Sequence, residues 1–259
     1  MIRLFFITFQ NQWSAHLKKP LEFFSSLLAV ILNNSFYLYG IYFLAILSVS
    51  DDPLATREYL VSTGMVLISW GLLNVFAGGL YDLSTLIENG ELEAYLAKPW
   101  SPLVLVAISK SNLVSLGEII QGAATMIFIA WLYGPFMGLR ALASSILLTF
   151  AFAGIIILIG SFSFYSSRGS QLSHVLLQVI LSLSLFPVGR ALQGREKWIL
   201  YLTPLLMTAT FPRIAALQGK LYLFIVFFLG TVVLYVFALY FFKFGLKRYQ
   251  SKNYIFLNE

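Results

Sequence analysis

The sequence predicts an all-α integral membrane protein with six membrane-spanning helices. Of its 259 residues, 59% are hydrophobic and only 11% are charged, whereas a soluble domain carries about 25% charged residues. Six uncharged or nearly uncharged runs approach the ~20 residues that a helix needs to cross the hydrocarbon core. No linker or low-complexity tract divides residues 1–259, so we expect a single transmembrane domain.

Residues 1–22 are expected to form an interfacial helix. Aromatic and leucine side chains recur at every fourth position, at Phe5, Phe9, Trp13, Leu17 and Leu21. Polar residues and lysines occupy the other faces, which suits a helix lying in the plane of the lipid headgroups. The alternative is that this stretch simply extends the first span.

The six predicted spans lie within residues 23–50, 59–81, 112–133, 141–167, 171–189 and 221–242. A further apolar run, residues 198–212, is too short to span and contains Pro204 and Pro212. We therefore expect residues 190–220 to form an outer re-entrant segment before the last span, because non-helical backbone at membrane depth needs such a protected setting. A buried loop of the bundle is the alternative.

The distribution of basic residues favours a multi-pass protein of the cell membrane with both termini in the cytoplasm. Short cytoplasmic loops are enriched in Lys and Arg, and the pair Lys18–Lys19 and the tail 243–252 are basic. Five basic residues around the re-entrant segment oppose this orientation, at Arg190, Arg195, Lys197, Arg213 and Lys220. The net charge of +6 is located near span ends, which indicates anionic lipid headgroups rather than nucleic acid as the partner.

Residues 82–103 form a charged segment between the second and third predicted spans. They contain four of the eleven acidic residues, Asp82, Glu88, Glu91 and Glu93. Leucine and isoleucine recur at helical spacing on both sides of Gly90, and Pro99 and Pro102 are expected to end the pattern. The pattern predicts a short helix–turn–helix on the membrane surface, placed to receive movement from a soluble partner. An ordinary solvated loop is the alternative.

The stretch from Gly90 to Pro99, GELEAYLAKP, resembles the pattern G-x-L-D/E-x-x-L-x-[RK]-P of the ABC-2 family of transporter permeases. The resemblance implies the membrane subunit of an ATP-driven exporter, in which this segment is a cytoplasmic coupling helix. It implies two cytoplasmic ATP-binding subunits, which carry ATP and Mg²⁺, and a second permease, identical or related. The residues it implicates in coupling are Glu88, Gly90, Glu91, Leu92, Tyr95, Leu96, Lys98 and Pro99.

Catalytic motifs are absent from the sequence. There is no GxxxxGK[ST] phosphate-binding loop, so we expect no ATP hydrolysis by this chain and no cofactor bound to it. There is also no GxSxG or HExxH motif, no cysteine, and only two histidines, His16 and His174. We therefore expect neither a catalytic site nor a metal site.

Polar side chains inside the predicted spans are the candidates for a translocation path, because such groups are costly in the membrane. They include Asn33, Asn74 and Glu118, the last near the start of the third span. Hydrogen bonds between helices are the alternative role, and Glu118 could pair with Lys110 or Arg168. Two other functions stay open: a secondary transporter driven by an ion gradient, and a membrane scaffold that transports nothing.

Overall fold

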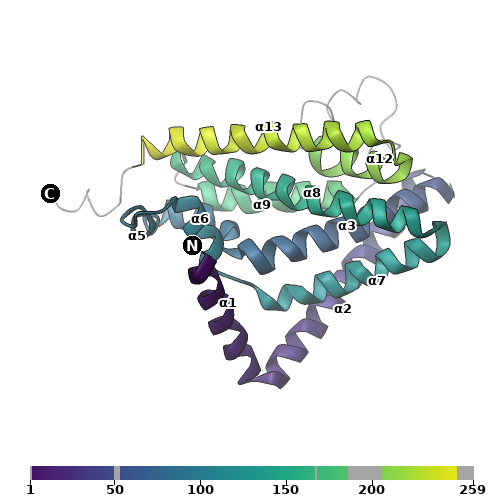
Figure 1. Ribbon diagram of the computed structural model, residues 1–259, viewed down its shortest axis with the longest axis horizontal. Coiled ribbons are helices and arrows are strands. Elements are labelled where there is room, and N and C mark those ends of the chain that lie inside the picture. Colours follow the sequence, from purple (N-terminus) through teal and green to yellow (C-terminus); the bar gives the residue numbers. More distant parts are fainter. Residues whose placement is uncertain (1, 50–52, 167, 186–205, 250–259) are drawn as a thin grey trace.

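The computed structural model describes residues 2–49, 53–166, 168–185 and 206–249 (Figure 1). No strand occurs in these ranges, so the all-α prediction is confirmed for them. The long helices are α1 (Ile2–Leu17), α2 (Pro20–Val49), α3 (Pro53–Ala77), α7 (Leu116–Tyr133), α8 (Pro135–Gly160), α9 (Gly169–Leu185) and α13 (Leu221–Leu246). The short ones are η1 (Gly78–Asp82), α4 (Leu83–Glu88), α5 (Glu93–Leu96), α6 (Pro102–Ser109), η2 (Leu113–Ser115), η3 (Ser161–Phe164), the π-helical turn η4 (Leu206–Thr210) and α12 (Phe211–Gln218).

Within the described residues, five helical stretches are long and apolar enough to cross a membrane, which makes this a multi-pass membrane protein. They are Pro20–Phe43, Leu54–Glu88, Leu113–Tyr133, Pro135–Phe164 and Leu221–Leu246. The remaining predicted span, 171–189, corresponds to α9, which is apolar but has only 17 described residues. Residues 186–205 lie outside the described ranges. The end of that predicted span and most of the predicted re-entrant segment therefore lie outside them as well. The described remainder of that segment is helical, in η4 and α12.

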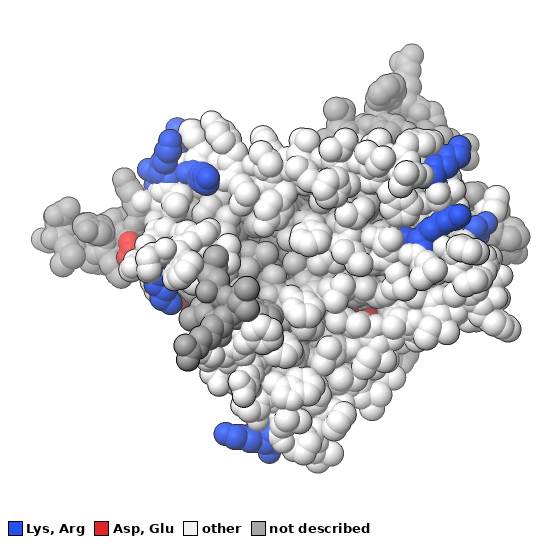
Figure 2. Space-filling model, in the orientation of Figure 1, with Lys and Arg blue, Asp and Glu red and all other residues white. Residues whose placement is uncertain are grey.

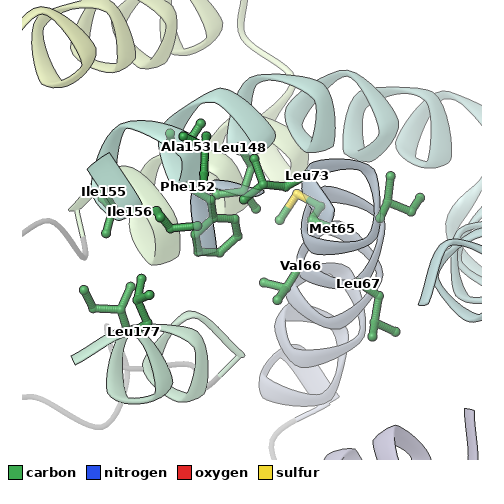
Figure 3. Close-up of a cluster of buried hydrophobic side chains, with 14 of the residues drawn as sticks. Met65, Val66, Leu67, Leu73, Leu148, Phe152, Ala153, Ile155, Ile156 and Leu177 are labelled. Atoms are coloured by element: carbon green, nitrogen blue, oxygen red, sulfur yellow. The ribbon is translucent and has the colours of Figure 1, made fainter. Parts of the chain in front are cut away.

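Helices α3 and α8 form the centre of the bundle. In the most apolar 18 residues of each span, 67% are buried in Leu54–Glu88, which contains α3, and 61% in Pro135–Phe164, which contains α8, against 6% for α2 and 17% for α13. Figure 3 shows the core between them: Leu148 and Phe152 of α8 lie close to Met65 of α3, and Leu177 of α9 adds to the cluster. Trp70 of α3 contacts the Phe152 ring edge-on, with the ring centroids 5.9 Å apart. The two central helices are therefore fixed by interdigitated large side chains.

Glycines let α3 and α7 approach closely, as small residues do between membrane helices. A Cβ at Gly71 would lie 2.6 Å from Ile119 Cγ1, and one at Gly122 would lie 2.7 Å from Ile68 Cγ1. Larger residues at either position would separate the two helices.

The surface of the molecule separates charge from apolar side chains along its long axis. Figure 2 shows Lys and Arg at the two ends and at the corner between α1 and α2, with a nearly uncharged band between them. Helices α2, α7 and α13 expose large apolar residues such as Phe36, Trp131 and Val233. This distribution is what a lipid-facing surface requires.

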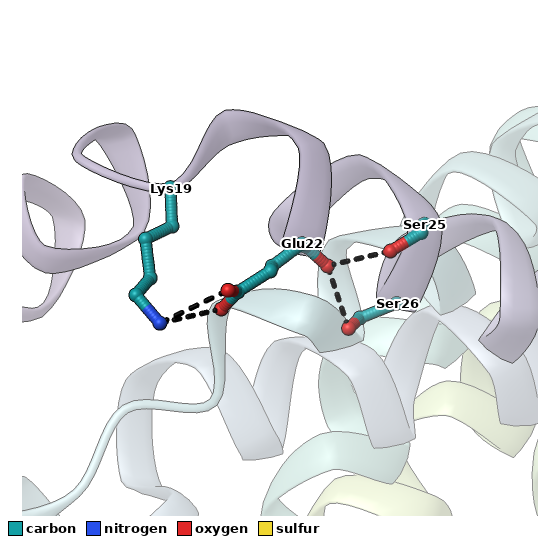
Figure 4. Close-up of polar contacts among 4 residues, drawn as sticks. All are labelled: Lys19, Glu22, Ser25 and Ser26. Atoms are coloured by element: carbon teal, nitrogen blue, oxygen red, sulfur yellow. Dashed lines mark hydrogen bonds and ion pairs between the residues drawn. The ribbon is translucent and has the colours of Figure 1, made fainter.

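The N-terminal helix α1 is separate from α2, and the two meet at an angle (Figure 1). The chain turns at Lys18–Lys19, and Pro20 begins α2, where its fixed φ suits a first helical residue. Figure 4 shows the junction: Lys19 Nζ pairs with the Glu22 carboxylate at 2.9 Å, and the hydroxyls of Ser25 and Ser26 donate to the Glu22 carbonyl. Ile2–Leu17 thus form a helix separate from the first span, whereas Pro20, Leu21 and Glu22 belong to α2. The position of residues 1–22 at the membrane surface stays a prediction.

Candidate functional site

The segment 82–103 is joined directly to the central helix α3. Helix α3 passes through η1 into α4, at the same end of the bundle as the start of α1 and the end of α13 (Figure 1). At Gly79 the backbone lies against α6, since a Cβ there would be 1.8 Å from the Val106 carbonyl oxygen. Asp82, at the end of η1, forms an ion pair with Lys110, which follows α6. Segment and central helix are therefore held together at this junction.

Helix α4 packs into the membrane domain rather than lying free on its surface. Leu83 and Ile87 are buried, and a Cβ at Gly160, the end of α8, would lie 3.2 Å from Leu83 Cδ2. The Glu88 carboxylate accepts a hydrogen bond of 2.8 Å from the backbone N–H of Ser170, in the first turn of α9. A carboxylate at a helix N-terminus is favoured by the unsatisfied N–H groups and the helix dipole. Glu88 thus connects the segment to α9.

The turn between α4 and α5 directs Leu92 into the protein core. Gly90 has φ +80°, a conformation that glycine adopts without strain. The Leu92 N–H donates to the Leu86 carbonyl at 3.1 Å, and the Leu92 side chain is fully buried. Leu92, which the family resemblance implicates in coupling, is therefore covered by the chain's own core and is not available for direct contact with a partner.

Tyr249, three residues after the end of α13, lies near the same turn, at Leu92 and Glu93. The ring of Tyr249 lies edge-on to Phe164 of η3, with the centroids 5.7 Å apart. Burial, together with the nearby Glu93 carboxylate, raises the pKa of the Tyr249 phenol. The last span and the segment are thus in contact through this tyrosine.

The outer face of the segment is exposed. Glu91, Ala94, Ala97, Lys98, Pro99 and Trp100 face solvent, while Tyr95 and Leu96 are half-buried. The Lys98 ammonium lies over the Tyr95 ring, 5.5 Å from its centroid, a cation–π contact. Between this face, α1 and α6 is a groove of about 690 Å³ lined by Thr8, Leu86, Glu91, Tyr95, Lys98 and Leu105, among others.

The two prolines of the segment have different roles. Pro99 lies in the non-helical stretch after α5, as predicted. Pro102, expected to end the pattern, instead occupies the first turn of α6. The physical reason is that proline lacks only an N–H that has no intrahelical partner in the first turn of a helix.

A polar cavity of about 380 Å³ opens between α2, α3, α7 and α9. The three residues predicted for a translocation path, Asn33, Asn74 and Glu118, all line it. Its other polar groups come from Asn34, Asn112, Ser115 and Gln178, and its rings from Tyr37, Trp70 and Tyr81. The Tyr37 hydroxyl is hydrogen-bonded to that of Ser182 at 2.5 Å, which joins α2 to α9 beside the cavity.

Glu118 is the acidic group of this cavity. It lies in the first turn of α7, and the side chains of Ser115 and Asn74 approach its carboxyl group. Its Oε2 atom is buried and has no hydrogen-bond partner. The expected pairing with Lys110 or Arg168 is wrong, because Lys110 pairs with Asp82 and Arg168 is exposed.

A second cavity, of about 390 Å³, extends the polar surface toward the segment 82–103. It shares Asn74, Tyr81 and Asn112 with the first cavity and is bounded by Asp82 and Lys110. Gln12 of α1 also lines it, and its Oε1 accepts a hydrogen bond of 2.9 Å from the Ser111 N–H. Polar side chains therefore lead from Glu118 to the Asp82–Lys110 ion pair.

The aromatic walls of the cavity were not predicted from the sequence. Trp70 and Tyr81 contact each other edge-on at 6.2 Å, and the Tyr81 ring lies 4.8 Å from that of His174. Nothing in their spacing separates them from the many lipid-facing aromatic residues. The only signal was their position on the helix that also carries Asn74.

These features define a class of protein: a polytopic helical membrane protein with a polar cavity among its spans and a compact segment packed on one end. The chain belongs to the ABC-2 family of transporter proteins, whose family model matches residues 29–253. The match covers every described element except α1 and the start of α2. No curated protein and no solved structure matches the chain. The family resemblance read from Gly90–Pro99 is thereby confirmed.

Proposed function

We propose that this chain is the membrane-spanning subunit of an ATP-driven exporter, which moves its substrate with energy from ATP hydrolysed on separate subunits. The observation that carries this proposal is the path of α3. The helix lines the polar cavity through Trp70 and Asn74 and continues without a loop into the segment 82–103. A force on the segment therefore acts directly on a wall of the cavity.

In this proposal the exposed face of the segment, with Lys98 and Trp100, docks on a cytoplasmic ATP-binding subunit. Two such subunits, which carry ATP and Mg²⁺, serve a pair of permeases, identical or related. The slight burial of α2, 6% of its span, leaves a large apolar face for the second permease or for lipid. The chain crosses the membrane six times, with α9 as the fifth span and both termini in the cytoplasm.

The packing of the segment explains how a movement would be transmitted. Leu83, Ile87 and Leu92 are fixed in the core, so α4 and the turn after it cannot move without their neighbours. Glu88 is bonded to the start of α9, and η1 is joined to α3. Both helices line the cavity, so closure of the ATP-binding subunits would change its walls on two sides.

Transport driven by an ion gradient is the second candidate function, because Glu118 is an acidic residue with a buried carboxyl oxygen at a cavity. The family assignment favours the ATP-driven exporter, since the resemblance that supports it includes the docking segment. The lack of a phosphate-binding loop in the sequence places hydrolysis on another subunit.

The experiment is purification of the chain alone and after co-expression with a candidate ATP-binding subunit from the same organism. The chain alone should show no ATPase activity, and the complex should co-purify and accumulate substrate in inside-out vesicles only with ATP. An ATP-binding subunit with its catalytic carboxylate replaced is the matched control. ATP turnover by the isolated chain, or equal accumulation with the control subunit, would refute the proposal.

Orientation is tested separately by single cysteines, since the sequence contains none. Ala97 lies in the segment, and Leu139, 61% exposed, lies near the start of α8, at the opposite end from Gly160. An impermeant reagent added outside intact cells should label Leu139→Cys and spare Ala97→Cys. Labelling at Ala97 would reverse the orientation.

A further inference from the structure

The described lining of the cavity between α2, α3, α7 and α9 contains an acidic side chain but no basic one. Among the described residues that line it, Glu118 is the only acidic one, and none is Lys, Arg or His. Lys110, which bounds the adjoining second cavity, is already paired with Asp82. Among the residues that the structure describes, Glu118 takes part in no ion pair. The cavity therefore contains a carboxyl group without a counter-charge.

The buried position of Glu118 disfavours an isolated carboxylate, so its negative charge needs a positively charged partner. Glu118 lies in the first turn of α7, an 18-residue helix whose N-terminal dipole stabilises a negative charge. Ser115 and Asn74 approach the carboxyl group, yet Oε2 stays buried without a partner. A buried carboxylate without a partner is costly, so a ligand that brings a positive charge would be bound strongly.

The remaining walls suit a cation with an apolar body. Tyr37, Trp70 and Tyr81 line the cavity with aromatic rings, whose faces attract organic cations. Leu38, Leu67, Leu181 and Leu185 supply apolar surface, and the asparagines supply hydrogen bonds. An anion would be repelled by Glu118, and a neutral molecule would leave the carboxylate unpaired.

We propose that this cavity binds positively charged amphipathic molecules, specifically ammonium compounds with an aromatic or aliphatic body, and that Glu118 supplies the counter-charge. The proposal rests on the proposed export function, because it names the substrate class of the same cavity. Trp70 and Tyr81 contact the cation or its body, and Asn33 and Asn74 orient it. The second cavity, bounded by Asp82 and Lys110, is the route from the segment side.

The test measures binding of phenyltrimethylammonium and of tert-butylbenzene, which has the same shape without the charge. The purified complex with its ATP-binding subunits is used, and binding is followed by equilibrium dialysis. The parent should bind the cation at least tenfold more tightly than the neutral compound. Glu118→Gln keeps the size of the side chain and should lower cation affinity at least tenfold, with neutral binding changed by less than twofold. Glu22→Gln removes an exposed carboxylate outside the cavity and should change neither.

A relocated charge distinguishes a binding role from a folding defect. Asn33→Asp, added to Glu118→Gln, returns a carboxylate to the cavity wall and should restore at least half of the lost cation affinity on a logarithmic scale. Equal affinity for both probes in the parent, or full cation affinity in Glu118→Gln, would overturn the ligand class. Either result leaves the export proposal standing, since that depends on ATP-dependent accumulation with the partner subunit and not on these probes.

Discussion

Replacing Trp100 with alanine separates docking of the segment on a partner from packing within the chain. The Trp100 side chain is 51% exposed, in the outer face of the segment. A tryptophan can bury about 250 Å², so about half of that, roughly 125 Å², remains for a partner. At about 25 cal/mol per Å², covering this area would contribute up to about 3 kcal/mol.

The predicted result is a weaker complex of a well-folded protein. A loss of up to about 3 kcal/mol corresponds to a decrease in affinity between about tenfold and about hundredfold, because 1.4 kcal/mol is a factor of ten. Thermal stability of the isolated chain should change little, as exposed substitutions usually cost within about 0.5 kcal/mol. The assay titrates the ATP-binding subunit onto the chain in nanodiscs and measures the dissociation constant.

Two matched variants interpret that result. Trp131→Ala removes a tryptophan that is 77% exposed on α7, away from the segment, and should leave the affinity unchanged. Leu92→Ala empties a fully buried position and should cost about 2–5 kcal/mol of stability, so this variant should be lost during purification. Parental affinity in Trp100→Ala, or a weaker complex in Trp131→Ala, would refute the reasoning.

Three further substitutions probe the contacts that hold the segment. Glu88→Ala leaves the Ser170 N–H without its acceptor and should lower stability by about 1–3 kcal/mol in a thermal unfolding assay. Glu88→Gln keeps an acceptor oxygen and should melt close to the parent. Equal melting temperatures of the parent, Glu88→Ala and Glu88→Gln would exclude the contact. Gly79→Val collides with the Val106 carbonyl and should abolish stimulation of ATPase activity, whereas a fully coupled variant would mean that α6 does not pack there. Because burial raises the pKa of Tyr249, its folded form favours the neutral phenol; that stability is present below the ordinary pKa near 10.0 and is lost as pH rises through the raised value. Tyr249→Phe should therefore melt less steeply with rising alkaline pH, and an unchanged slope would contradict this.

The sequence predicted the class of fold because membrane helices satisfy their own backbone and are read from long apolar runs. The spans around α3, α7, α8 and α13 were found in this way. The ends of the spans were harder to predict, because a helix can continue beyond the apolar run into polar residues. The second stretch, for example, continues through η1 and α4 to Glu88. Pro102 was misread because proline both ends and begins helices.

The candidate site was predicted by residue type but not by arrangement. Asn33, Asn74 and Glu118 stood out because polar groups inside a membrane are costly, and one cavity brings them together. Which residue pairs with which depends on tertiary packing, so the Asp82–Lys110 pair and the free Oε2 of Glu118 could not be foreseen.

For the segment 82–103, too, the sequence predicted residue types but not their contacts. Its helical periodicity identified an apolar face correctly, but periodicity does not say what covers that face. Leu92 is covered by the chain itself, while Trp100, outside the repeat, is exposed. Only the folded packing distinguishes the two.

Site-specific photo-cross-linking tests most directly the claim that the segment 82–103 docks on an ATP-binding subunit. A photoreactive amino acid is placed at Ala97, exposed in the segment, or at Leu139, 61% exposed near the opposite end of α8. On irradiation in cells that express both subunits, position 97 should form a covalent adduct with the ATP-binding subunit and position 139 should not. An adduct from position 139 with none from position 97 would contradict the account.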